Sequence, residues 1–129
     1  MDQYTRLLYT SIAGIIAGFL GGLLGMSGTV IMLPLLVLFN IFNNYKIAIG
    51  TVLFSFDPFG SIFALVKNVI ENRIDYYVAL ILFFTYIFGS YIGTLYNAKL
   101  SEKTIKYMTA IILLFLSIYM FYNGYQIKS

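Results

Sequence analysis

The chain has 129 residues, of which 60% are hydrophobic and only 10% are charged. A soluble domain contains about 45–50% apolar and about 25% charged residues, and at this length it buries only about two-thirds of its surface. The composition therefore excludes an ordinary soluble domain and a disordered chain, and it predicts an integral membrane protein.

The residue types that are missing exclude several kinds of chemistry. The sequence contains no Cys and no His, so thiol nucleophiles, disulfides, imidazole bases and the usual zinc ligands are excluded. No nucleophile–base pair is visible, and we expect no enzymatic activity, no metal and no cofactor. The net charge of +3 comes without a clustered basic surface, so we expect no nucleic-acid partner.

The charged residues divide the chain into apolar segments. Most of them fall within residues 67–75 and 99–106 or close to the two ends. A membrane crossing needs about 20 apolar residues. We predict membrane segments at about residues 7–25, 29–42, 47–66, 76–98 and 107–127. The predicted fold is all-α: a polytopic helical bundle of four to five segments, forming a single domain over residues 1–129, surrounded by lipid in the cell membrane.

The first apolar stretch, residues 7–45, is too long for one crossing. A helix rises about 1.5 Å per residue, and the hydrocarbon core is about 30 Å thick. The pattern is interrupted at residues 25–29, and Pro34 follows. We predict a full helix, an irregular turn at membrane depth and a shorter half-helix, which together form a broken or re-entrant hairpin.

Glycines recur at helical spacing in two of the predicted spans. Gly14, Gly18 and Gly22 lie in the first, and Gly89 and Gly93 lie in the fourth. Small residues at such spacing allow two helix backbones to approach closely in lipid. The favoured interpretation of these glycines is therefore structural.

The interruption at residues 25–29 has a functional interpretation. Non-helical backbone at membrane depth occurs only where it is buried in protein or lines a wet cavity. A half-helix that starts near Thr29 would direct free N–H groups and a partial positive charge at that cavity, which favours an anion. The side chains of Ser27 and Thr29 would add two hydroxyl donors. The alternative is a kink filled by neighbouring side chains.

A second interruption lies at residues 55–58. Asp57 is a charge inside a predicted span, where a carboxylate is costly. Asp followed by Pro is typical of a helix start, so Asp57 and Ser55 could belong to the cap of a second broken helix. The alternative is a protonatable, ion-coupling group that faces the same cavity.

Two motifs carry a resemblance to a known family. One is a glycine-rich turn, G-x-G-G-G, with a proline five residues after its last glycine. Gly25, Gly28 and Pro34 match it, whereas Ser27 and Thr29 stand at glycine positions. The other motif is A-x-G-T, which residues 48–51 match with Gly50 and Thr51. On these motifs the chain resembles one unit of the TauE/SafE sulfite exporter family, whose members usually carry two.

The resemblance implies a secondary transporter or facilitator of a small inorganic or organosulfur anion, such as sulfite, a sulfonate or a similar oxyanion. In our leading hypothesis the anion lies against the amides of Gly28 and Thr29, and the hydroxyl groups of Ser27 and Thr51 help to orient it. Gly25 and Gly50 belong to the same two motifs. A single unit suggests a homo-oligomer, such as a homodimer. The alternative is a non-transporting scaffold, or a partner subunit of a full-length transporter.

Overall fold

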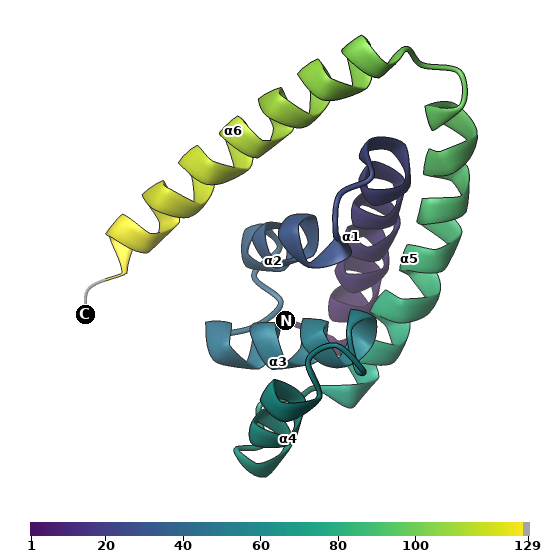
Figure 1. The fold of residues 1–129 in the computed structure, drawn as a ribbon. Coiled ribbons are helices and arrows are strands. Elements are labelled where there is room, and N and C mark those ends of the chain that lie inside the picture. The colour runs from purple at the N-terminus through teal and green to yellow at the C-terminus, as the bar shows by residue number, and fades with distance from the viewer. Residues whose placement is uncertain (128–129) are drawn as a thin grey trace.

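The computed structural model describes residues 1–127, which contain six helices and no strand (Figure 1). The helices are α1 (Gln3–Leu24), α2 (Gly28–Leu38), α3 (Tyr45–Phe56), α4 (Ile62–Ile70), α5 (Tyr76–Asn97) and α6 (Glu102–Gln126). The predicted all-α membrane bundle is confirmed. Three of the helices, α1, α5 and α6, are long and apolar enough to cross a membrane, whereas α2 and α3 are apolar but shorter.

Helices α1 and α5 form the most closely packed pair, and the glycines lie where they touch. A Cβ atom on Gly22 would lie 2.2 Å from the backbone oxygen of Ser90, and one on Gly93 would lie 2.1 Å from that of Phe19. A Cβ atom on Gly18 or on Gly89 would lie 2.3 Å from a backbone oxygen of the opposite helix, and one on Gly14 would overlap the side chain of Thr85. Larger residues here would force the two helices apart.

Both ends of this pair are fixed by polar contacts, and these show that α1 and α5 run parallel. At the beginning of both helices, Arg6 donates to Asp75 at 2.6 Å. At the far end, the Asn97 side chain donates to the backbone oxygen of Leu23 at 2.6 Å. Since two parallel helices begin at the same end, the chain between them has to return, and α2, α3 and α4 make this return.

The return begins with α2. The ring of Phe39, which follows α2, stacks on Tyr9 with 5.4 Å between centroids. The guanidinium of Arg6 lies 5.3 Å from the centroid of Phe42. The chain has therefore come back to the beginning of α1 by residue 42. From there α3 runs inward along α5, where Ser55 reaches the backbone oxygen of Ala79.

The predicted segment at residues 47–66 is divided between α3 and α4 in the structure. Residues 57–61 form a turn between α3 and α4. The carboxylate of Asp57 accepts from the Gly60 N–H at 3.0 Å and from the Ser61 hydroxyl at 2.6 Å. Pro58 lies inside this turn, and α4 begins only at Ile62. At residues 57–61, hydrogen bonds to the Asp57 carboxylate therefore take the place of helical hydrogen bonds.

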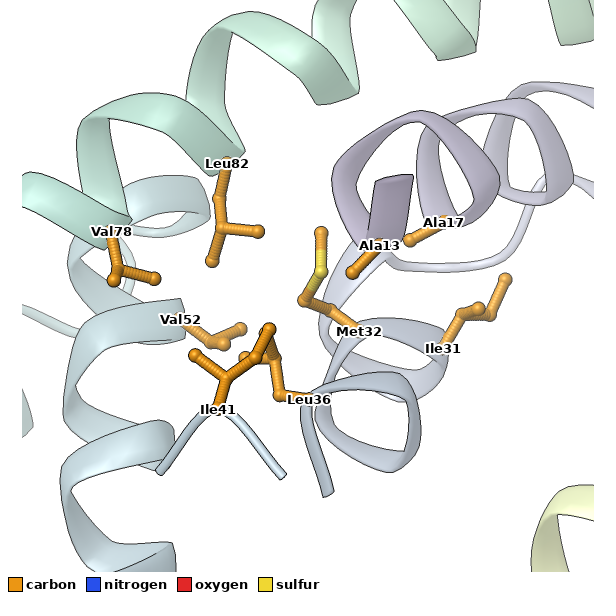
Figure 2. Packing of buried hydrophobic residues seen from close by; sticks show 9 residues of the cluster. All are labelled: Ala13, Ala17, Ile31, Met32, Leu36, Ile41, Val52, Val78 and Leu82. Atoms are coloured by element: carbon orange, nitrogen blue, oxygen red, sulfur yellow. The ribbon is translucent and has the colours of Figure 1, made fainter. Parts of the chain in front are cut away.

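The buried core joins four helices and the connection after α2 (Figure 2). Its members are Ala13, Ala17, Ile31, Met32, Leu36, Ile41, Val52, Val78 and Leu82. They come from α1, α2, α3, α5 and residue 41. Burial of these apolar side chains fixes the short helices α2 and α3 against the α1–α5 pair.

Helix α6 is different, because none of its residues is buried. It starts with a cap, in which the Thr104 N–H donates to the Ser101 hydroxyl at 3.2 Å. It then runs back obliquely from the end of α5, past α2 and at an angle to the α1–α5 pair (Figure 1). Near its own end, Asn123 and Gly124 line a pocket together with Asn40 and Phe42. Helix α6 therefore finishes at the end of the bundle where α1 begins.

Candidate functional site

The two interruptions predicted from the sequence lie on one cleft. This cleft has a volume of about 470 Å³ and lies between the start of α2 and the end of α3. It is lined by Ser27, Thr29, Leu33, Ile49, Val52, Leu53, Phe56 and Asp57. Segments that are far apart in the sequence thus place three polar side chains on an otherwise apolar wall.

The side of the cleft formed by α2 presents a helix start. Gly25 ends α1 in the left-handed region, with a φ of 70°, and its N–H donates to the Gly21 oxygen. This conformation favours glycine because it has no Cβ atom. Ser27 then occupies the N-cap of α2 but makes no side-chain cap bond. Its hydroxyl lies 3.0 Å from that of Thr29 instead.

The missing cap at the start of α2 affects the electrostatics of the cleft. The first N–H groups of a helix have no partner inside the helix, and here the cap side chain does not supply one. The positive end of the α2 dipole therefore lies beside the cleft, next to the hydroxyl groups of Ser27 and Thr29. This arrangement suits the oxygen atoms of a small anion.

Asp57 supplies the opposite charge on the wall formed by α3. Its side chain is exposed and lines the cleft, while both of its oxygens accept the turn hydrogen bonds of Gly60 and Ser61. The carboxylate thus holds the turn and also faces the cleft. In its charged form it would repel an anion there.

Three residues predicted for the site lie elsewhere: Thr51 and Ser55 face the start of α5, and Gly50 faces the connection that precedes it. A Cβ atom on Gly50 would lie 2.4 Å from the backbone oxygen of Arg73. The hydroxyl of Thr51 accepts from the Asp75 N–H at 2.9 Å. The hydroxyl of Ser55 lies 2.9 Å from the backbone oxygens of both Thr51 and Ala79. Thr51 and Ser55 attach α3 to the start of α5, and Gly50 allows the connection before α5 to approach α3 closely. All three residues are buried, and none of them lines the cleft.

Pro34 is also buried, inside α2. Proline has no N–H group, so the helix lacks one of its internal hydrogen bonds at this point. Because it is buried, Pro34 lies on the side of α2 that faces the core.

Tyr86 on α5 was not predicted, and it contacts both interruptions. Its ring centroid lies 4.7 Å from that of Phe56, the last residue of α3. A Cβ atom on Gly28 would lie 2.7 Å from the Tyr86 ring, and one on Gly21 would lie 2.5 Å from its hydroxyl oxygen. The sequence contains twelve tyrosines, and no motif distinguishes Tyr86 from the others. Its helical spacing to Gly89 and Gly93, however, places Tyr86 on the face of α5 toward α1.

Within residues 1–127 no three acidic side chains come together in a group that could hold an ion.

Comparison with known proteins identifies the family. The sequence model of the family described as Sulfite exporter TauE/SafE matches residues 10–128. The chain belongs to this family. With its three long apolar helices, it is a multi-pass integral membrane protein. The names of the family and its relatives are those of transporters, which agrees with the expectation that the chain is not an enzyme.

Two curated relatives extend over most of the chain. A protein of Bacillus subtilis, named "Probable membrane transporter protein YunE", is 31% identical over 95% of this chain and 45% of its own length. A protein of Methanocaldococcus jannaschii, named "Probable membrane transporter protein MJ0441", is 28% identical over 92% of this chain and 47% of its own length. The chain thus spans about half the length of these relatives. No solved structure matches it.

Proposed function

We propose that this chain is a transport unit for a small anion, and that the anion binds in the cleft between α2 and α3. The observation that carries the proposal is the start of α2, where the N-cap side chain leaves the first turn uncapped beside a cleft of about 470 Å³. The family description, Sulfite exporter, supports sulfite, a sulfonate or a similar oxyanion as the substrate.

The cleft favours weak binding. Its lining contains no Lys or Arg, so helix N–H groups and two hydroxyl groups would have to stabilise the anion. A helix dipole contributes about 0.3–1 kcal/mol at exposed sites and up to about 2 kcal/mol in sheltered ones. Weak and reversible binding is what transport requires, because the substrate has to leave again.

Asp57 gives the proposal its coupling step. A charged carboxylate on the same cleft opposes the anion, and protonation removes this repulsion. We therefore propose that Asp57 is either protonated while the anion is bound, so that a proton accompanies the anion, or set back from the anion as a cap. The hydrogen bonds from Gly60 and Ser61 keep the carboxyl group in place during this step.

A homo-oligomer of these units is the proposed working form. Helix α6 contributes no buried residue, and the chain covers 45% and 47% of the two relatives. A second copy would supply a surface for α6 and would restore about the length of the longer proteins. We place the assembly in the cell membrane, surrounded by lipid.

The half-length match also favours a second candidate function. A unit that lacks the other half of its relatives could act as a scaffold or as a partner subunit of a full-length transporter. The two functions differ in whether the purified chain moves anions by itself.

The experiment that tests the proposal is sulfite flux in proteoliposomes that contain only this chain. The proposal expects uptake well above that of protein-free liposomes, with competition from other small oxyanions. The absence of uptake, together with crosslinking only to a different membrane protein in cells, would favour the partner-subunit function. Glutaraldehyde crosslinking of the purified chain measures the homo-oligomer independently of flux.

A further inference from the structure

We infer a second binding site, separate from the cleft, for a phosphate-type oxyanion between the first turns of α1 and α5. The structure has a pocket of about 280 Å³ there, with Gln3, Arg6 and Thr10 from α1 and Tyr77 from α5 in its lining. The group bound would be either the phosphate of an anionic lipid or a free phosphate-type ion, since both present the same acceptor oxygens.

Thr10 is the observation that points to a ligand. Its side chain is fully buried, and within residues 1–127 its hydroxyl oxygen has no hydrogen-bond partner. Other threonines inside these helices use the helix itself: Thr85 donates to the Ile81 oxygen at 2.7 Å, and Thr109 donates to the Ile105 oxygen at 2.8 Å. Buried hydroxyl groups are normally paired, so the unpaired hydroxyl of a residue in the pocket lining favours a ligand acceptor.

The helix ends make the same pocket electropositive. Because α1 and α5 run parallel, the positive ends of both dipoles lie at this end of the bundle. The N-cap of α5 is satisfied, since Asp75 accepts from the Val78 N–H at 3.1 Å. The N-cap of α1 is not, because Asp2 makes no side-chain cap bond. The first N–H groups of α1 are therefore available.

Arg6 adds a fixed positive charge with spare donors. One terminal nitrogen contacts Asp75 at 2.6 Å, while a guanidinium has five N–H groups in a planar fork. Asp75 thus neutralises part of the charge without using up the donors. An oxyanion that accepts from Arg6 and Thr10 would form charge-assisted hydrogen bonds, which are stronger than neutral ones.

The position of the pocket agrees with a ligand at the membrane surface. It lies at the beginning of two long apolar helices, and its deeper lining includes the apolar side chains of Leu7 and Ile81. Basic pockets between membrane helices are known to hold lipid head groups. Because the pocket is just below the roughly 300 Å³ at which pockets for larger ligands begin, it suits a small group.

Binding of two probes tests the site, each by native mass spectrometry and by thermal unfolding. The first probe is inorganic phosphate added to the purified chain in detergent. The second is phosphatidylglycerol, placed in nanodiscs of phosphatidylcholine. The variants are Thr10→Val, which removes the hydroxyl and keeps the shape, and Arg6→Gln. The control is Thr109→Val, where the lost hydroxyl served only its own helix.

We expect at least one probe to bind the unchanged chain and Thr10→Val to weaken it about tenfold, the effect of losing one hydrogen bond to a charged group. Thr109→Val should leave the affinity unchanged. Protection by phosphate alone would identify a free ion, and protection only by phosphatidylglycerol would identify a lipid head group. If neither probe binds, or if Thr10→Val binds as tightly as the unchanged chain, the site does not exist. Neither readout depends on transport through the cleft.

Discussion

The ring of Tyr86 occupies the space that a side chain on Gly28 would need. A Cβ atom on Gly28 would lie 2.7 Å from a ring carbon of Tyr86, closer than such atoms approach in real proteins. The first residue of α2 is thus held against the middle of α5. The uncapped helix start depends on a contact with a helix that comes almost sixty residues later in the sequence.

Gly28→Ala tests this contact. We expect it to lower the free energy of unfolding by about 1–3 kcal/mol, as overpacking usually does, and to reduce anion flux because the start of α2 has to move. Detergent-induced unfolding and proteoliposome flux measure the two effects. Gly124→Ala is the matched control, since a Cβ atom there meets nothing within 4 Å.

The pair Gly28 and Tyr86 also predicts non-additivity. Tyr86→Leu removes the ring that blocks the added methyl group, so the double variant should be less destabilised than the sum of the two single variants. Residues in contact show interaction energies of about 0.5–3 kcal/mol. Additive single effects would mean that the ring is not what excludes a side chain at residue 28.

Asp57→Asn separates coupling from turn formation. The amide has an oxygen that can still accept from Gly60, so we expect the fold to be retained. If the carboxyl group carries a proton during transport, the dependence of flux on pH should become flat in this variant. Unchanged flux and an unchanged pH profile would remove the coupling role and leave Asp57 as a turn residue.

Asp57→Ala provides the comparison for stability. It removes both acceptors of the turn, and a typical intramolecular hydrogen bond contributes about 0.5–1.5 kcal/mol to stability. Thermal unfolding should therefore show a lower midpoint for Asp57→Ala than for Asp57→Asn. Equal midpoints would show that the hydrogen bonds from Gly60 and Ser61 do not hold the turn.

The parallel arrangement of α1 and α5 predicts which residues share a membrane face. The sequence contains no Cys, so each introduced thiol is unique. Cysteines at Tyr4 and Tyr77, near the start of the two helices, should react with a membrane-impermeant maleimide from the same side. A cysteine at Lys99, beyond the end of α5, should react from the other side. Labelling of Tyr4→Cys and Tyr77→Cys from opposite sides would contradict the fold.

Composition and spacing were enough to predict the long helices and the first interruption. The apolar length of a span and the conformational freedom of glycine act locally, so residues 25–29 could be identified without knowledge of the fold. The break at Asp57 could also be predicted, but the first residue of α4 could not. Hydrogen bonds inside the turn keep residues 57–61 out of the helix, so that α4 begins at Ile62.

The composition of the site was harder to predict, since it depends on which face of α3 meets α5. Thr51 and Ser55 are small and polar, which suits a binding site as well as a helix contact. Only the parallel packing of α5 decides this, because it places the Asp75 N–H and the Ala79 oxygen beside them. Tyr86 could not be selected for the same reason, as its partners lie on three other helices.

The start of α1 and the end of α6 lie at the same end of the bundle, and therefore at the same face of the membrane. A second copy fused after α6 in a longer chain would enter the membrane in the same direction as the first. The two halves of such a protein would then be related by an axis along the membrane normal, and not by the in-plane axis of inverted repeats. Two separate chains could reproduce this arrangement only by inserting in the same orientation.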